Sequence, residues 1–349
     1  MAKTFFLHAG PPKTGSTAIQ EFFRDNAAVF ARHGLFRPLT GTEHRSHYHF
    51  DLVEAFRPGS STRPLLARLS QEIEAHGRPE RVFISAEHFS HRLSDPGYLA
   101  ALTGFCSNLG YRLHVIAYAR PHAALLNSLY TQNVKSWRPV PPIDAFVTRE
   151  IQSGRHDYLH HFAALRNLKE ADVTLRPFSR AVLKRGLTVD ICAVMGLDMT
   201  GETLVAAEED KNASPGPMTV AAFERLRRRI NRDHPDLSRE ALAPLTWPLL
   251  RAAGALGWNA EKYGGISTAV HTMIERSFAK SNAEVARLHW SKDWADVFTE
   301  ADLSPTPYNV FDPAIANPPA RRAFRDFIEQ SAEAIAEIAA LHQDQGRRK

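Results

Sequence analysis

The sequence predicts an α/β fold with a central parallel sheet, because short strand-like runs alternate with stretches of helical periodicity. Four runs rich in β-branched and aromatic residues indicate strands, at residues 4–7, 82–85, 113–118 and 173–175. The first run leads straight into a glycine-containing loop, and a helical pattern begins after it. Alternation of this kind favours a parallel sheet covered by helices, with ligands at the carboxyl ends of the strands.

The first helix is expected between the first two strands. Ser16 or Thr17 can cap its N-terminus, and Gly34 can end it. Apolar residues recur along it at helical spacing, at Ile19, Phe22, Phe23 and Phe30. The order strand, loop and helix is therefore predicted for the start of the chain.

A second region is expected, because 349 residues exceed what one hydrophobic core usually accommodates. Residues 208–217 are polar and rich in turn formers, which indicates a boundary. Helical periodicity recurs beyond it, at residues 220–230, 267–278 and 321–342. We therefore expect an α/β core at residues 1–215 and a mainly α-helical C-terminal region at residues 216–349, packed on the core.

Composition narrows the possible partners and compartments. A formal net charge of +5 suits an anionic small ligand or acidic acceptor, and no nucleic-acid recognition module is evident. The two cysteines, Cys106 and Cys192, form no pairing pattern, so both are expected to be buried in a protein of a reducing compartment. No stretch reaches the ~18 apolar residues of a membrane span, and the strand at residues 4–7 leaves no room for a signal peptide. A cytoplasmic protein is predicted, and its oligomeric state is left open.

Residues 8–17, HAGPPKTGST, carry the strongest functional signal. Backbone N–H groups of a glycine loop, the positive end of the next helix, a lysine and hydroxyl groups can converge on one multiply charged anion. Gly10 and Gly15 keep the spacing of the Walker pattern G-x-x-x-x-G-K-[ST], but Lys13 lies inside the loop. The loop therefore predicts an anion site that differs from that of an ordinary nucleotide triphosphatase.

A second anion site is expected where the third strand ends. Arg120 ends this strand, Pro121 suits the first turn of the next helix, and Ser128 follows about two helical turns later. A guanidinium and a hydroxyl can hold a second phosphate together. The alternative is a surface ion pair for Arg120 and a helix contact for Ser128, which the neighbouring anion loop disfavours.

On the loop at residues 10–17, on Arg120 with Ser128, and on the strand end at residues 176–178, the chain resembles the sulfotransferases that use 3′-phosphoadenosine 5′-phosphosulfate (PAPS). The resemblance covers most of residues 3–215. It implies a three-layer fold like that of the P-loop nucleotide triphosphatases, with a central parallel sheet. It also implies PAPS as co-substrate and adenosine 3′,5′-bisphosphate as product.

The resemblance also implies roles for particular residues. Arg120 and Ser128 would hold the 3′-phosphate, and Lys13 would act in catalysis. Lys211 lies in a segment similar to the loop before the C-terminal helices of bacterial members, and it would contribute to nucleotide binding. The 5′-phosphosulfate would be held by the first loop, through Pro12, Lys13, Thr14, Gly15, Ser16 and Thr17.

The expected chemistry needs a base but no metal. A lysine can stabilise charge on the leaving oxygen, and neither residues 82–85 nor residues 113–116 end in the aspartate of a magnesium-binding strand. Glu87, just past the second strand, is the first candidate for the base of the acceptor, and His88 is its rival. A structural role for both, with Glu87 capping the next helix, is the remaining alternative.

The sequence indicates the residues of the acceptor pocket less clearly than those of the anion sites. His47 and His49 belong to a histidine-rich segment whose spacing is not diagnostic of zinc, and they either line this pocket or pack the surface. Trp137 follows the helix of Ser128 and is a candidate for lining the cleft. Arginines crowd one further helix, where they form a solvated face or contact an anionic acceptor: Arg225, Arg227, Arg228, Arg229 and Arg232.

These features together predict a PAPS-dependent sulfotransferase. Its acceptor would be a hydroxyl or amine of a carbohydrate, lipid or small molecule, with neither nucleic acid nor a membrane span involved. Two alternatives remain. A P-loop kinase or nucleotide triphosphatase would bind Mg-ATP, whereas a non-catalytic scaffold would bind nucleotide without turnover.

Overall fold

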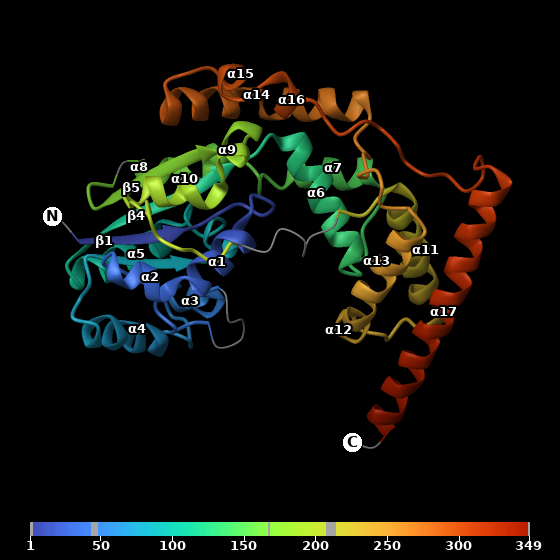
Figure 1. Cartoon of the computed structure of the whole chain (residues 1–349), viewed down its shortest axis with the longest axis horizontal. Coiled ribbons are helices and arrows are strands. Elements are labelled where there is room, and N and C mark those ends of the chain that lie inside the picture. The colour runs from blue at the N-terminus through green and yellow to red at the C-terminus, as the bar shows by residue number, and fades with distance from the viewer. Residues whose placement is uncertain (1–2, 43–47, 167, 207–213, 348–349) are drawn as a thin grey trace. The chain divides into compact units, whose positions relative to one another are not determined.

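The computed structural model describes residues 3–42, 48–166, 168–206 and 214–347 (Figure 1). The chain forms two compact units. Unit 1 contains Met1–His122, Ser153–Glu209 and Ser277–Leu303, and unit 2 contains Ala123–Gln152, Asp210–Arg276 and Ser304–Lys349. In the described part of the chain, the backbone passes from one unit to the other at the start of α6 (His122–Lys135), after residue 152, inside α14 (Thr268–Trp290) and after residue 303.

Unit 1 is built on a five-stranded sheet in the order β2-β3-β1-β4-β5, with every neighbouring pair parallel (Figure 1). This confirms the predicted α/β class and its parallel sheet. The four expected strands are present, and a short one was missed because it has only two residues. The bounds are β1 (Lys3–His8), β2 (Leu35–Phe36), β3 (Arg81–Ser85), β4 (Tyr111–Ala119) and β5 (Ala171–Pro177).

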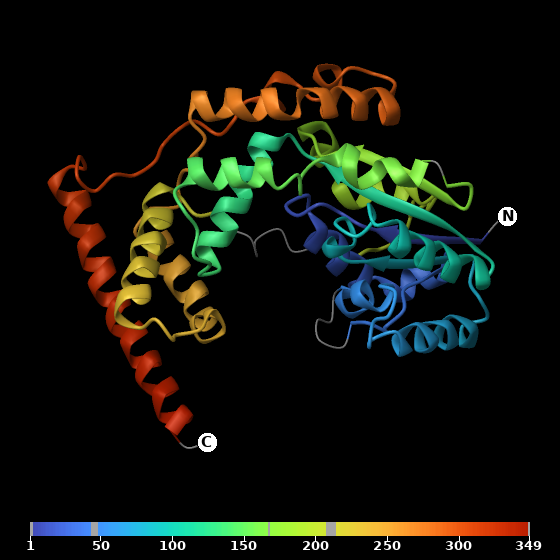
Figure 2. The same ribbon diagram turned by 180° about the vertical axis from the view of Figure 1, so that it is seen from behind.

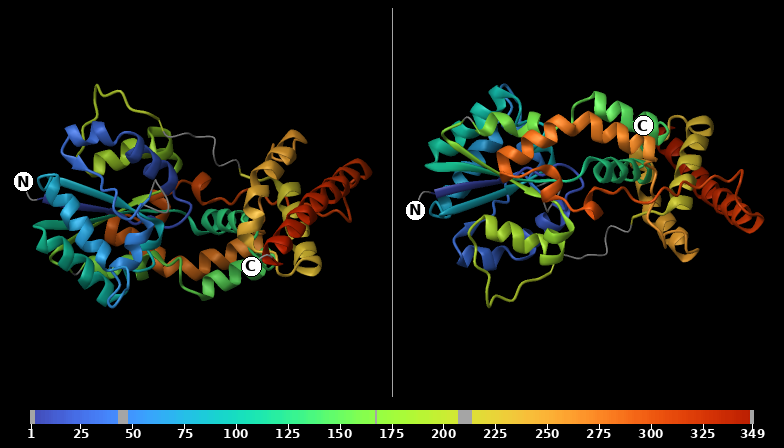
Figure 3. Two further views of the ribbon diagram at one scale, coloured as in Figure 1. Left: turned by 90° about the horizontal axis from the view of Figure 1, so that it is seen from below. Right: turned by 90° about the horizontal axis from the view of Figure 1, so that it is seen from above.

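Helices cover both faces of this sheet (Figure 3). Side chains alternate along a strand, so Phe5 and Phe6 enter different layers. Phe6 joins a core formed with α1 (Ser16–Asp25), α2 (Ala27–Arg32), α9 (Arg180–Arg185) and α10 (Leu187–Val194). Phe5 packs edge-on against Phe105 of α5 (Pro96–Asn108), with ring centroids 6.2 Å apart. Both faces of β1 are thus buried, as its three consecutive apolar residues at positions 5–7 require.

The single helix expected to begin at Ser16 or Thr17 and end at Gly34 is two helices, α1 and α2, so that prediction was wrong in one respect. The chain breaks at Asn26, whose side-chain amide donates to the carbonyls of Phe22 and Val205 at 2.9 Å. The side-chain oxygen Oδ1 of Asn26 accepts from the backbone N–H of Val205 at 2.8 Å. A side chain that bonds backbone groups in this way competes with helix continuation. The N-cap prediction was also wrong. The N-cap of α1 is Gly15, whereas Ser16 and Thr17 were the expected candidates.

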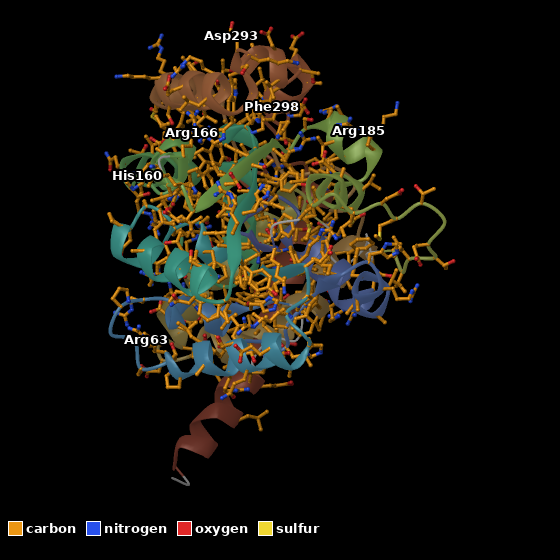
Figure 4. All side chains as sticks on the ribbon, turned by 90° about the vertical axis from the view of Figure 1, so that its left-hand side faces the viewer. Arg63, His160, Arg166, Arg185, Asp293 and Phe298 are labelled. Carbon is orange, nitrogen blue, oxygen red and sulfur yellow. The ribbon has the colours of Figure 1, made fainter. Side chains whose placement is uncertain are left out.

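The C-terminal half of α14 and several shorter helices complete unit 1. Trp290, at the end of α14, donates from its indole Nε1 to the carbonyl of Leu175 in β5 at 2.6 Å. Phe298, labelled in Figure 4, is fully buried against the rings of Trp290 and Trp294. The remaining elements are α3 (Phe50–Ala55), α4 (Pro64–Ala75), η1 (Glu87–Phe89), α8 (Tyr158–Arg166), α15 (Trp294–Val297) and α16 (Glu300–Leu303).

Unit 2 is helical in its described part. The expected helices at residues 220–230 and 321–342 are present as α11 (Pro217–Asp233) and α17 (Pro318–Arg347), which lie side by side (Figure 2). The helix expected at residues 267–278 is the first half of α14. The other elements are α7 (Ile143–Gln152), α12 (Arg239–Leu242), η3 (Ala243–Leu245) and α13 (Thr246–Ala255).

Both cysteines are buried free thiols, as predicted. Burial raises the pKa of the Cys192 thiol to about 12, and it raises that of Cys106 as well. Among the described residues, no helix is long and apolar enough to cross a membrane.

Candidate active site

The loops after β1, β3 and β4 meet at one edge of the sheet. In the register, His8 pairs with Ser85 of β3 and with Ile116 of β4. Sheet-like bonds continue past the strand ends, from the N–H of Ala9 to Ile116 at 2.9 Å and from the N–H of Ala86 to His8 at 3.2 Å. Residues that follow these strands are therefore brought together by backbone pairing, at the edge where parallel sheets bind ligands.

The loop between β1 and α1 has the backbone of an anion cradle. Lys13 and Gly15 both adopt left-handed conformations, with φ of 66° and 79°. The Thr14 hydroxyl donates to the carbonyl of Pro11 at 2.7 Å and closes the loop from inside. The first intrahelical bond of α1 runs from Ile19 to Gly15, so the N–H groups of the preceding turn have no intrahelical acceptor. Such N–H groups and the helix dipole favour a negative charge at this position.

Both loop glycines are closely approached. A Cβ at Gly15 would lie 2.3 Å from Cδ2 of Leu187, so only hydrogen fits there without movement. A Cβ at Gly10 would lie 3.0 Å from both His8 Nε2 and Ser16 Oγ. Two polar side-chain atoms therefore face the loop backbone from beneath.

His8 is a buried polar group that sequence reasoning did not single out. Gln20 donates to the Ser85 hydroxyl at 3.1 Å, and this hydroxyl lies 2.8 Å from His8 Nδ1. This arrangement favours the tautomer in which Nδ1 accepts and Nε2 carries the hydrogen. Among the described residues Nε2 has no hydrogen-bond partner. Burial lowers the pKa of His8 to about 3, so at neutral pH it presents an uncharged N–H beneath the loop.

Arg120 reaches the loop from the end of β4. Its guanidinium Nη1 donates to the carbonyl of Lys13 at 2.8 Å, and the guanidinium carbon Cζ lies 5.6 Å from the ring centre of Phe178. The hydroxyl of the buried Tyr158 fixes its backbone, since it accepts from the N–H of Arg120 at 3.0 Å and donates to its carbonyl at 2.8 Å. Arg120 thus follows the end of β4 and contacts the first loop.

Lys13, Arg120 and Glu87 form one electrostatic cluster. Burial lowers the pKa of Lys13, Arg120 lowers it further, and Glu87 raises it. Burial also lowers the pKa of Arg120. Burial raises the pKa of Glu87, while the Lys13 ammonium and the neighbouring Ser16 hydroxyl lower it. Two half-buried cations, Lys13 and Arg120, thus lie near each other with the Glu87 carboxylate beside the lysine, a balance that favours binding of an anion.

The two base candidates differ in their surroundings. His88 is exposed, and its ring meets that of Phe50 edge-on at 4.9 Å. Glu87 begins η1 and is coupled to the lysine of the loop. It does not cap the next long helix, because Asp95 accepts from the first backbone N–H groups of α5.

The other predicted site residues that the structure describes belong to unit 2 or are committed to packing. His49 is fully buried, with Nδ1 accepting from the N–H of Ser85 at 3.0 Å and Nε2 bonded to the carbonyl of Pro38 at 2.9 Å. Trp137 is buried in unit 2, where its indole donates to Thr246. Ser128 belongs to the unit 2 part of α6. His47 and Lys211 lie outside the described residues.

Arg176, part of the motif at residues 176–178, is held within unit 1. Its guanidinium forms two hydrogen bonds to the Asp190 carboxylate, one of them from Nε at 3.0 Å. The hydroxyl of Tyr118 donates to the same carboxylate at 3.0 Å. This network ties β4 and β5 to α10 and leaves Phe178 as the residue of the motif that contacts the cluster.

Comparisons of the chain with protein-family models, with curated proteins and with solved structures gave no match. The geometry of this edge of the sheet is therefore the basis for assigning a function.

Substituting Gly15 by Ala should destabilise unit 1 by more than left-handed strain alone, which costs about 1–2 kcal/mol. The matched control is Gly77→Ala, because Gly77 has a φ of 72° but no atom within 4 Å of its Cβ position. The measurement is the free energy of unfolding in urea for both variants. Equal losses would contradict the close packing of Leu187 against the loop.

Proposed function

We propose that the chain is a PAPS-dependent sulfotransferase. The observation that carries the proposal is the cluster of Lys13, Arg120 and Glu87 around a left-handed glycine loop, at the carboxyl edge of a parallel sheet. Two cations and a helix N-terminus suit the phosphosulfate of the donor, and a carboxylate beside them suits an acceptor proton. The family resemblance of the sequence supports the same reading.

In the proposed reaction, the acceptor hydroxyl or amine attacks the sulfur of the donor and its proton passes to the Glu87 carboxylate. The new bond to sulfur forms while the bond between sulfur and the 5′-phosphate oxygen breaks. The electron pair stays on that oxygen, where the Lys13 ammonium and the loop N–H groups stabilise it. Arg120 holds the carbonyl of Lys13 and so keeps the lysine backbone in its left-handed conformation.

A P-loop kinase or nucleotide triphosphatase is the less favoured candidate. Lys13 precedes the second glycine, and β3 and β4 end in Ser85 and Ala119, where a magnesium-binding aspartate would be expected. A non-catalytic scaffold would not require a half-buried carboxylate that interacts with the loop lysine. The acceptor class stays as the sequence predicts it, a hydroxyl or amine of a carbohydrate, lipid or small molecule.

Substituting Lys13 by Ala should reduce sulfuryl transfer by roughly 10²- to 10³-fold, while affinity for adenosine 3′,5′-bisphosphate changes much less. An ammonium that stabilises charge developing on the leaving oxygen raises turnover more than ground-state affinity. Labelled PAPS incubated with cell extracts identifies an acceptor, and the rate with this acceptor is then measured. Lys184→Ala, at an exposed lysine of α9, is the control. Normal turnover with only a raised KM would contradict the role.

Substituting Glu87 by Gln should reduce turnover by about 10²- to 10⁴-fold without loss of nucleotide affinity. A base acts only when deprotonated, so wild-type activity should rise with pH through the pKa of Glu87. Because burial raises this pKa, the rise should lie above the range of an ordinary carboxyl group. The variant should lack this limb of the pH profile, whereas His88→Asn should retain both limb and turnover. The opposite pattern would identify His88 as the base.

A further inference from the structure

A basic groove lies in unit 2 between α11 and α17, which run beside each other (Figure 2). Its volume is about 560 Å³. Every cation that lines it is an arginine: Arg225, Arg228, Arg229, Arg232, Arg321 and Arg325. Arginine binds sulfate, phosphate and carboxylate groups through two parallel N–H bonds, a geometry that lysine cannot offer.

The arginines form two rows. Four of them occupy one face of α11 at spacings of three and four residues, from Arg225 to Arg232, and so extend over roughly 10 Å of helix. Arg321 and Arg325 occupy successive turns of α17. Arg321 also donates to the carbonyls of Ala314 and Ala316, which fixes the segment before this helix. Guanidiniums thus follow both walls of an elongated groove.

The positive charge of the groove is only partly balanced. Arg229 bonds Glu329 at 3.1 Å, and Arg228 lies 3.9 Å from Glu224. Next to the lining, Asp233 bonds Arg232 at 2.7 Å and lies 3.5 Å from Arg229, and Asp326 lies 3.8 Å from Arg325. Six guanidiniums therefore face four carboxylates. Arg225 has no ion pair among the described residues, and the side chains of Arg228 and Arg325 are 64% and 71% exposed. Exposed cations of this kind are available to a ligand.

The two carboxylates of the groove lining indicate which kind of anionic ligand it suits. Glu224 and Glu329 would repel a ligand that carries only negative groups, but carboxylate oxygens accept hydrogen bonds from hydroxyl groups, as Glu224 does from the Tyr130 hydroxyl at 2.6 Å. A lining of guanidinium donors interspersed with carboxylate acceptors therefore suits a chain that carries anionic groups and hydroxyl groups together. Acidic polysaccharides, with sulfate or uronate groups, have this chemistry.

We propose that this groove binds a segment of an acidic polysaccharide. The choice of a polysaccharide as the acceptor of sulfuryl transfer rests on the proposed function, because its hydroxyls are acceptors. Binding to the groove itself rests on the arginines and carboxylates of unit 2. Energy from such binding, away from the reacting atoms, can raise the efficiency of transfer.

Other polyanions fit less well. Single-stranded nucleic acid is held by exposed aromatic rings, whereas the ring of Phe324 in the groove wall is only 7% exposed and packs against Phe311. Duplex DNA is read by elements that protrude into its grooves, and this surface is concave. A membrane surface is contacted by an amphipathic face with exposed large apolar residues, whereas Phe324 and Ile328 of this lining are buried and Phe311 is half-buried.

The test measures binding of the full chain to defined probes by calorimetry at two salt concentrations. The probes are a heparin oligosaccharide, an oligogalacturonate, neutral dextran, polyglutamate and single-stranded oligo(dT). The triple variant Arg225→Glu, Arg228→Glu, Arg325→Glu removes exposed groove cations but keeps Arg229 and Arg321. Its matched control reverses the same number of exposed charges of unit 2 outside the groove, at Arg239, Arg251 and Arg276. A triple Arg→Gln version of the groove variant serves if the Glu version does not fold.

We expect both acidic oligosaccharides to bind, dextran not to bind, and the groove variant to lose at least about tenfold in affinity with a weaker salt dependence. The control variant should lose clearly less. Equal losses in the two variants, or tighter binding of polyglutamate or oligo(dT), would overturn the proposal. Affinity for adenosine 3′,5′-bisphosphate is measured in parallel. If the nucleotide binds and the oligosaccharides do not, the groove proposal alone fails; if only the oligosaccharides bind, the sulfotransferase proposal fails.

Discussion

The hydrogen bond from the Arg120 guanidinium to the carbonyl of Lys13 is the contact on which the site depends. It links the end of β4 to the loop after β1, and it helps hold Lys13 in a left-handed conformation that a residue with a Cβ rarely adopts. Tyr158 and Phe178 in turn fix Arg120, one through its backbone and the other through its guanidinium. The loop geometry is thus a product of three strand ends, not of the loop sequence alone.

This arrangement places like charges together in a partly buried site. Burial and the neighbouring Arg120 both disfavour the charged form of Lys13 and lower its pKa, and the Glu87 carboxylate raises it. A bound anion would offset the repulsion between Lys13 and Arg120, and this relief would contribute to its binding free energy. His8 adds an uncharged donor below the loop, which increases the polarity of the cradle without adding a further cation.

Much of the fold could be predicted because its signals are local. The four longer strands are continuous runs of apolar, β-branched and aromatic residues, and the anion loop has a recognisable glycine spacing. The helix break at Asn26 could not be predicted, because it depends on bonds to Val205, far along the chain. β2 has only two residues and owes its existence to pairing with β3.

The site was predictable to a similar extent. The positions of Lys13, Glu87 and Arg120 after strand ends follow from the α/β pattern, and the structure brings the three together. The burial of His49 and the contact of Tyr158 with Arg120 could not be predicted, because nothing in their local sequence distinguishes a packed histidine or tyrosine from one that faces a ligand.

The central claim is that this loop is built for a nucleotide with a sulfated or phosphorylated 5′ end and needs no metal to bind it. Calorimetric titration of the full chain with adenosine 3′,5′-bisphosphate in the presence of EDTA, and separately with Mg-ATP, tests it most directly. The account predicts saturable one-to-one binding of the bisphosphate in EDTA, tighter than that of Mg-ATP. Binding of Mg-ATP alone would contradict it.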